Sequence, residues 1–97
     1  MNIGHFILKD KKPLETDLIS WALWMNDVSQ RIVAKDKFGD VEVSTVFLGL
    51  DHNWGGGEPL LFETMIFGGE YADYQKRCST WEQAEKMHKD AIDLINK

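Results

Sequence analysis

The chain has 97 residues, of which 43% are hydrophobic and 28% charged, with a net charge of −5 and a single cysteine. One cysteine excludes an intrachain disulfide, and the acidic balance disfavours free-standing nucleic-acid binding, which needs clustered Lys and Arg against phosphates. We therefore expect one domain spanning residues 1–97, with a charge that suits a protein partner whose surface is basic.

Targeting and membrane-spanning segments are not expected. The segment Met1–Leu8 lacks the basic region and the cleavage site of a signal peptide. No apolar run approaches the roughly 20 residues that a membrane-spanning helix requires. A lone cysteine is usual in a reducing compartment, so we expect a cytoplasmic protein that does not contact a membrane.

The N-terminal third predicts an edge strand followed by an apolar helix. The strand is Ile3–Leu8, and the polar run Lys9–Pro13 ends it. Thr16 or Asp17 caps the helix that follows. Apolar side chains then recur at spacings of three and four, at Leu18, Trp21, Ala22, Met25 and Val28. Because further apolar residues widen this stripe, we expect the helix to be contacted on more than one side.

The middle of the chain predicts a hairpin of two long apolar strands. After a short strand at Arg31–Lys35, the strands Val41–Leu50 and Leu60–Phe67 follow, joined by the glycine-rich loop Asn53–Pro59. Both long strands carry apolar residues on both faces, so we expect both faces of the sheet to be covered. The cover is either a helix on each side or, on one side, a subunit or partner.

The C-terminal third predicts a second helix. Glu70–Arg77 is a frayed edge strand or a loop, and both Ser79–Glu82 and Thr80–Gln83 match a capping box. The helix should run to about Asn96. Its apolar stripe comprises Trp81, Ala84, His88, Ala91, Ile92 and Ile95. The whole order predicts an α+β fold, with a mainly antiparallel sheet of about four strands and two helices.

His88 is the main candidate for a site. It lies on the apolar stripe, so it should point at the sheet, and a buried imidazole needs a partner for each ring nitrogen. One interpretation is a core histidine hydrogen-bonded to Asp51 or Glu63. The other is a structural zinc held by some of Asp51, His52, Cys78 and His88. The lack of Cys-x-x-Cys or His-x-x-x-His spacing favours the core histidine.

The loop after the first long strand carries candidate contact residues. Its glycines favour a hairpin connection with positive φ angles over a phosphate-binding loop, because the P-loop lysine and the following helix are missing. Trp54 is either a binding anchor or a cap on the core, and both interpretations stay open. The candidate interaction residues are Trp54, Glu58, Glu70 and Asp73.

Enzymatic activity is the alternative hypothesis. Cys78 with His52 or His88 would make a nucleophile and its base, but no oxyanion loop accompanies them. Asp51, His52 and His88 would serve a small metal-dependent hydrolase or a nucleotide-binding protein. We expect a non-enzymatic protein, because no complete catalytic motif is present.

Three segments resemble a family of small proteins encoded by phages and prophages. They are residues 43–52 (VSTVFLGLDH), residues 59–69 (PLLFETMIFGG) and Ser79–Glu85 together with His88, and the likeness spans roughly residues 41–90. The resemblance implies an accessory protein, first of all an inhibitor of bacterial defence of the anti-CRISPR kind. Its partner would be a protein with a basic surface, such as a Cas nuclease, in the cytoplasm of the infected host. The chain would be a monomer or a homodimer.

The resemblance also bears on the site. The Asp51–His52 pair and His88 recur in that family, which implies a shared site. Cys78 departs from the pattern, since another residue is expected there, so its role as a ligand is the least secure.

Overall fold

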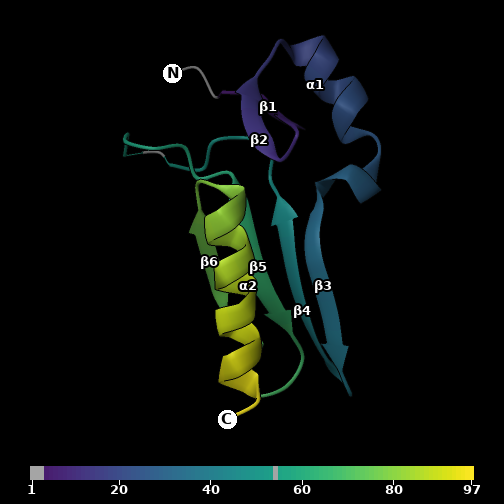
Figure 1. Ribbon diagram of the computed structural model, residues 1–97, viewed down its shortest axis with the longest axis vertical. Helices are drawn as coiled ribbons and strands as arrows, with labels where there is room; N and C mark the ends of the chain where they lie inside the picture. Colours follow the sequence, from purple (N-terminus) through teal and green to yellow (C-terminus); the bar gives the residue numbers. More distant parts are fainter. Residues whose placement is uncertain (1–3, 54) are drawn as a thin grey trace.

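The computed structural model describes residues 4–53 and 55–97, and it has the expected α+β class (Figure 1). A two-stranded hairpin and helix α1 form the N-terminal part. A four-stranded sheet and helix α2 form the rest. The elements in chain order are β1 (Phe6–Lys9), β2 (Lys12–Glu15), α1 (Leu18–Met25), the 3-10 helix η1 (Val28–Arg31), β3 (Ile32–Phe38), β4 (Val41–Phe47), β5 (Phe62–Phe67), β6 (Gln75–Cys78) and α2 (Trp81–Ile95).

The main sheet is an antiparallel meander in the order β3-β4-β5-β6. Its centre is the predicted hairpin of β4 and β5, in which Thr45 lies directly opposite Thr64. Helix α2 runs along one face and contacts all four strands (Figure 1). Since side chains alternate along a strand, every second residue of β4 and β5 faces this helix.

The core lies between α2 and these alternate residues. Towards the start of α2, Phe47 and Phe62 pack together with ring centroids 5.3 Å apart, against Ala84. Towards its end, a second cluster joins Val43 and Ile66. The residues described as buried all come from β4, β5, their flanking positions and α2, so this half of the molecule contains the hydrophobic core.

The capping box of α2 is confirmed. Thr80 is the N-cap, and its hydroxyl accepts a hydrogen bond from the Gln83 backbone N–H at 3.1 Å. The Gln83 side chain accepts in return from the Thr80 N–H at 3.2 Å. The helix ends at Ile95, one residue before the expected end. The predicted stripe is correct, because Ala84, His88 and Ala91 are buried.

The prediction that a helix covers each face of the sheet is wrong for the described part of the chain, and the alternative that a subunit or partner covers one face stays a prediction. The face opposite α2 carries no helix there (Figure 1). Val46 and Met65 on that face are half-buried, and Phe67 is 48% exposed. Helix α1 lies instead beyond the end of the sheet, beside the β1–β2 hairpin (Figure 1).

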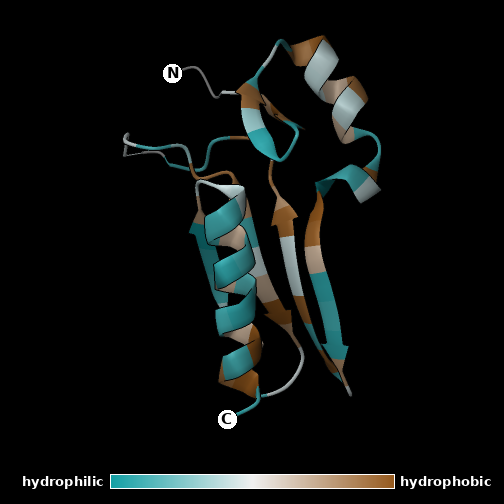
Figure 2. Ribbon diagram, in the orientation of Figure 1, coloured by the Kyte–Doolittle hydropathy of each residue, from teal (hydrophilic) through white to brown (hydrophobic). Residues whose placement is uncertain are grey.

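Helix α1 also differs from its prediction. Asp17 is the N-cap, as one alternative had it, and its carboxylate accepts from the Ser20 N–H at 2.8 Å. The helix ends at Met25 and contains no buried residue. Contact on more than one side is therefore not observed within the chain. Figure 2 shows hydrophobic and neutral residues along α1, whereas the outer side of α2 is mostly hydrophilic.

Two strands were missed or left open by the sequence. The expected turn Lys9–Pro13 is only the pair Asp10 and Lys11, and β2 follows it directly. Both turn residues have positive φ angles, 51° and 67°. Strand β6 lies within the segment that was expected to be a frayed edge strand or a loop, and it pairs with β5.

Candidate functional site

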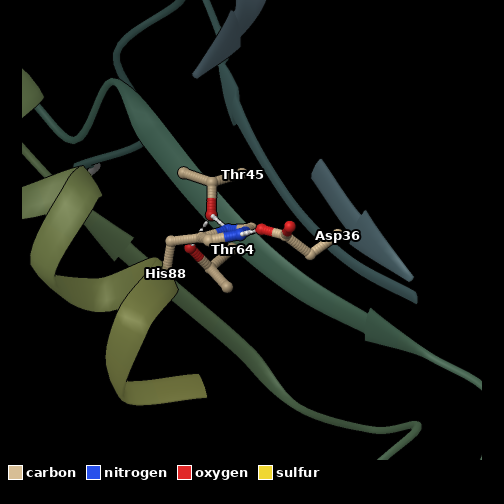
Figure 3. A network of polar contacts seen from close by, with 4 residues as sticks. All are labelled: Asp36, Thr45, Thr64 and His88. Atoms are coloured by element: carbon tan, nitrogen blue, oxygen red, sulfur yellow. Dashed lines mark hydrogen bonds and ion pairs between the residues drawn. The ribbon is translucent and has the colours of Figure 1, made fainter. Parts of the chain in front are cut away.

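His88 points into the sheet, as predicted, and is 5% exposed (Figure 3). Its Nδ1 lies 2.7 Å from Thr45 Oγ1 on β4. Its Nε2 lies 2.8 Å from Asp36 Oδ2 on β3. The expected partners were Asp51 or Glu63, and this expectation is wrong. The imidazole links helix α2 to the two strands β3 and β4.

The hydrogens of this network follow one consistent direction. A carboxylate only accepts, so Nε2–H donates to Asp36. In the neutral imidazole this leaves Nδ1 as the acceptor for the Thr45 hydroxyl. The Thr45 oxygen then accepts from the Thr64 hydroxyl. We call Asp36, Thr45, Thr64 and His88 the His88 network. Every polar hydrogen in it has an acceptor, which is what a buried polar group needs.

Strand register explains how Asp36 reaches His88. Asp36 lies opposite Val43, which faces α2, so Asp36 is on the α2 side of the sheet while Lys35 and Lys37 are on the other side. The predicted strand ended at Lys35 and so left Asp36 outside it. The signal that would have found it is the alternation of Ala34 and Asp36 with the two lysines.

The network resembles a catalytic triad in its order of acid, imidazole and hydroxyl. The hydroxyl groups, however, belong to Thr45 and Thr64, which are both 0% exposed. A nucleophile has to touch its substrate, and these oxygens lie beneath α2. The arrangement therefore stabilises the packing of the helix on the sheet and gives no reactive group to a ligand.

Glu63 has its own partners on the opposite face of the sheet. It is 8% exposed, and its Oε2 accepts from Gln75 Nε2 at 2.7 Å and from Arg77 Nε at 2.9 Å. The sequence required a partner for a carboxylate in a central strand, and β6 provides two. Glu63 thereby ties the edge strand β6 to the centre of the sheet.

Asp51 closes the glycine-rich loop. Its Oδ1 accepts from the N–H groups of Asn53 at 2.8 Å and of Leu60 at 3.0 Å. The Asn53 side chain donates to the carbonyl of Glu58 at 2.9 Å. The positive φ angles of Gly56 and Gly57 agree with the predicted hairpin connection. Trp54 lies outside the described residues, so both interpretations of it stay predictions.

Cys78 is packed against the first core cluster. Its thiol donates to the carbonyl of Thr80 at 3.7 Å. Burial raises the pKa of the Cys78 thiol, which keeps it protonated at neutral pH. A nucleophilic cysteine needs a lowered pKa, so this environment does not favour the hypothesis of a Cys–His pair.

The side chains of three candidate zinc ligands, Asp51, Cys78 and His88, have separate hydrogen-bond partners, and the backbone N–H of His52 donates to the Leu60 carbonyl at 3.1 Å. Within residues 4–53 and 55–97, no group of three or more His, Cys, Asp or Glu side chains is placed to hold a metal ion. Asp51 binds backbone N–H groups, Cys78 binds Thr80, and His88 belongs to its network. The zinc site therefore stays a prediction.

The candidate interaction residues also lie apart in the structure. Glu58 precedes β5, whereas Glu70 and Asp73 follow it, so they lie at opposite ends of that strand. A pocket of about 390 Å³ over the β1–β2 hairpin is lined by Lys9, Asp10, Lys12, Pro13 and Leu14, and Glu58, Glu70 and Asp73 do not line it.

Comparison with known proteins adds no information about this site. No known protein family, curated protein or solved structure matches it. In the described part of the chain, no helix has both the length and the apolar character that crossing a membrane requires. The resemblance to phage proteins consequently stays a prediction, and what the chain does has to be inferred from its own residues.

Proposed function

We propose that the chain is a phage-type accessory protein that acts on an effector of host defence by protein–protein contact, without catalysis. The observation that carries the proposal is a group of exposed carboxylates at one end of the sheet, which we call the acidic end. It consists of Asp40, Glu70, Asp73 and Asp93.

Three segments converge at the acidic end. The β3–β4 turn holds Asp40, whose carbonyl lies against Gly68 at the start of the β5–β6 connection. That connection carries Glu70 and Asp73. Helix α2 ends at the same end of the sheet, with Asp93 in its last turn (Figure 1). The carbonyl groups of a helix C-terminus add partial negative charge.

The acidic end keeps a net negative charge. Lys37, Lys76 and Lys97 are exposed at or next to the same end, but three lysines do not balance four carboxylates. Such a surface attracts a basic partner and accelerates its approach at low ionic strength. A channel that binds nucleic acid is basic, and a Cas nuclease has such a channel. The location that follows is the cytoplasm of the infected cell.

The side chains that could act in catalysis are engaged in the fold, which supports binding over catalysis. Both ring nitrogens of His88 are hydrogen-bonded inside the core. Asp51 stabilises the glycine-rich loop, and Cys78 keeps its proton. Each of these residues contributes to the fold that presents the acidic end.

The test is binding of a purified Cas nuclease, with and without guide RNA, in a salt titration. From about 0.1 to 1 M salt the screening length falls from roughly 10 to 3 Å, and we expect the affinity to fall steeply over this range. The variant E70K/D73K should weaken binding by at least about tenfold. Bound guide should compete, because it occupies the same basic surface.

The matched control is E15K/E85K, which makes the same change in net charge at exposed positions outside the acidic end. It should leave most of the affinity intact. Equal losses in both variants would mean that only net charge matters, which contradicts a localised acidic end. Binding that is indifferent to salt would contradict the proposal as well.

A structural zinc belongs to the same proposal, as a clasp that would hold sheet and helix together. Elemental analysis of protein purified without chelator or nickel affinity tests it. About one zinc per chain, lost in a His88→Ala variant, would support the clasp. If metal-free protein still binds the effector, the contact through the acidic end stays in the proposal and the zinc is removed from it.

A further inference from the structure

The β1–β2 hairpin has two unlike faces. Phe6 and Leu8 pack against the first core cluster, and side chains alternate along a strand. The alternate residues of β1 therefore point to the opposite side of the hairpin, together with their partners on β2. We call this set the outer face of the hairpin, and it comprises Ile7, Lys9, Lys12 and Leu14.

Two lysines of the outer face lie directly opposite each other. Lys9 pairs with Lys12 at the end of the hairpin, and residues in directly opposed positions have Cβ atoms about 5 Å apart. Like charges in such positions repel each other. None of the ion pairs in residues 4–53 and 55–97 includes either lysine. An anion placed between the two ammonium groups would contact both and replace the repulsion by attraction.

The turn of the hairpin is basic although the chain is acidic. Lys9–Lys12 holds three lysines and one aspartate, for a net charge of +2, whereas the whole chain carries −5. Glu15 of the same hairpin pairs with Phe6 and so lies on the inner side. The acidic end is at the other end of a molecule 42 Å long (Figure 1). Charges more than about 8 Å apart are largely screened at physiological ionic strength, so the turn attracts anions.

The pocket over the hairpin combines this charge with apolar walls. Lys9, Lys12 and Leu14 of the outer face line it together with Asp10 and Pro13. Its volume of about 390 Å³ is at the small end of ligand sites, which span roughly 300–1,000 Å³. Leu14 is 49% exposed, and the stems of the lysines are apolar, as Leu14 and Pro13 are.

Lys11 holds the turn against the rest of the fold. Its Nζ lies 5.4 Å from the ring centroid of Trp81, at the start of α2. A cation over an aromatic ring is a favourable contact. Together with the packing of the inner side on the core, this contact fixes the hairpin while Lys9, Lys12 and Leu14 stay exposed.

We propose that this pocket binds a small amphiphilic anion. One carboxylate or phosphate group lies between Lys9 and Lys12, and a short apolar body lies against Pro13 and Leu14. A lysine ammonium acts as a point charge without the fork geometry of arginine, so both kinds of head group fit. Because Asp10 offsets part of the charge, the pocket suits one anionic group and not several. The proposal does not depend on the acidic end or on its partner.

The test is a titration of the isotopically labelled full chain with octanoate or octyl phosphate, each kept below the concentration at which it forms micelles. We expect saturable changes of the amide NMR shifts that are concentrated in residues 7–14, with a Kd of about 1 mM or below. Acetate lacks the apolar body, and octylamine carries the opposite charge. Both should bind at least about tenfold more weakly than octanoate.

Two variants separate the contributions of charge and of the apolar wall. K9E/K12E should weaken binding of octanoate by at least about tenfold. Its matched control is K89E/K97E, which makes the same change in net charge at exposed positions of α2 and the C-terminus, and it should bind like the wild type. Leu14→Ala should weaken octanoate by about threefold or more, because less apolar surface is buried. Circular dichroism should be unchanged in all three variants.

Several outcomes would overturn the pocket. One is the absence of saturable shifts with either probe, and another is an equal loss in K9E/K12E and K89E/K97E, which would make net charge the cause. Equal affinity for octanoate and octylamine would leave no role for the two lysines. Binding to vesicles of phosphatidylglycerol without binding of the monomeric probes would assign the hairpin to a membrane surface. Loss of effector binding in E70K/D73K with intact octanoate binding would leave this inference standing.

Discussion

The two parts of this molecule differ in how they bury their apolar residues. In residues 32–97, the sheet and α2 enclose a core. Between Phe47 and Ile66 it includes five side chains that are less than 2% exposed, among them Phe62 and Thr64. Residues 4–31, in contrast, contain no buried residue, although α1 is the more apolar helix. Apolar sequence is therefore not sufficient for a core. A helix stabilises a fold when another element covers it, and within the described chain α2 is covered and α1 is only half covered.

The two parts meet around Gly49 and at the first core cluster, against which Phe6, Leu8 and Trp24 pack. The Gly49 carbonyl accepts from Trp21 Nε1 at 3.0 Å and from the Phe6 N–H at 2.8 Å. His5 forms an isolated bridge with Leu50. Because no residue within 4–31 is buried, we expect the N-terminal part to loosen more easily than the sheet and α2. The following predictions test this difference, beginning with the largest effect.

Removing a core ring should have the largest effect. Phe62 is fully buried and packs on Phe47 and Trp81, so Phe62→Ala should lower the free energy of unfolding by about 3–5 kcal/mol. Leu14→Ala, at a half-exposed residue of the N-terminal part, should lower it by no more than about 0.5 kcal/mol. Urea denaturation followed by circular dichroism measures both. Equal losses would show that the N-terminal part has a core of its own.

The His88 network should come next. Thr45→Val keeps the volume of the side chain but leaves Nδ1 of His88 and the Thr64 hydroxyl unpaired in the core. We expect a loss of about 1–3 kcal/mol in the free energy of unfolding, because unpaired buried polar groups keep their full desolvation cost. Thr16→Val changes a hydroxyl outside the network and serves as the control. A Thr45→Val variant as stable as the wild type would mean that the network does not stabilise α2.

Gly49→Ala should act on the junction. Gly49 has a φ of 77°, and a Cβ there would lie 2.7 Å from Met25 Sδ and 3.0 Å from Trp21 Nε1. The substitution should destabilise the attachment of α1 by about 1–2 kcal/mol, from the positive φ and the overlap together. Hydrogen exchange should speed up in residues 4–31 and remain slow in α2. Gly39→Ala, also at a positive φ but in open space, is the control. Exchange that speeds up equally in α2 would contradict a separable N-terminal part.

The smallest effect is a pH dependence at the start of α1. Hydrogen bonds from the Ser20 N–H and hydroxyl lower the pKa of Asp17. A carboxyl group whose pKa is lowered by folding stabilises the fold above its unfolded pKa of about 4, and this stabilisation is lost as the pH falls through the folded pKa. The exchange protection factors of residues 18–25, which correct for the intrinsic effect of pH on amide exchange, should therefore fall below about pH 4.

Asp17→Asn supplies the control for this pH dependence. Asparagine also caps a helix but does not titrate, so the variant should keep its exchange protection across the same pH range. If wild type and variant respond alike, a group other than Asp17 is responsible.

The sequence was most informative where a feature depends on neighbours along the chain. The capping box at Thr80 was identified, and so was the hairpin of β4 and β5, because both are encoded in a few consecutive residues. Strand β2 was missed for a related reason. The turn Asp10–Lys11 adopts positive φ angles at both residues without the Asn-Gly or Asp-Gly pair that usually marks such a turn.

The candidate site was only half predictable. The inward direction of His88 follows from helical periodicity, whereas its partner Asp36 follows from the register of β3 on β4. That register is set by pairing between strands, and the predicted strand ended at Lys35, three residues before the end of β3 at Phe38. Asp51 was expected as a partner of His88, but its carboxylate accepts hydrogen bonds from backbone N–H groups and closes the glycine-rich loop.

By itself, the sequence determined the α+β class, the capped second helix and the inward face of that helix, since periodicity and capping act over a few residues. Only the tertiary structure decided which strand supplies the acid for His88, and that the side of α1 with Leu18, Ile19 and Leu23 lies uncovered. Those outcomes depend on contacts between segments far apart in the chain. Local pattern indicates that a face is apolar, and the packing of distant elements decides whether anything covers it.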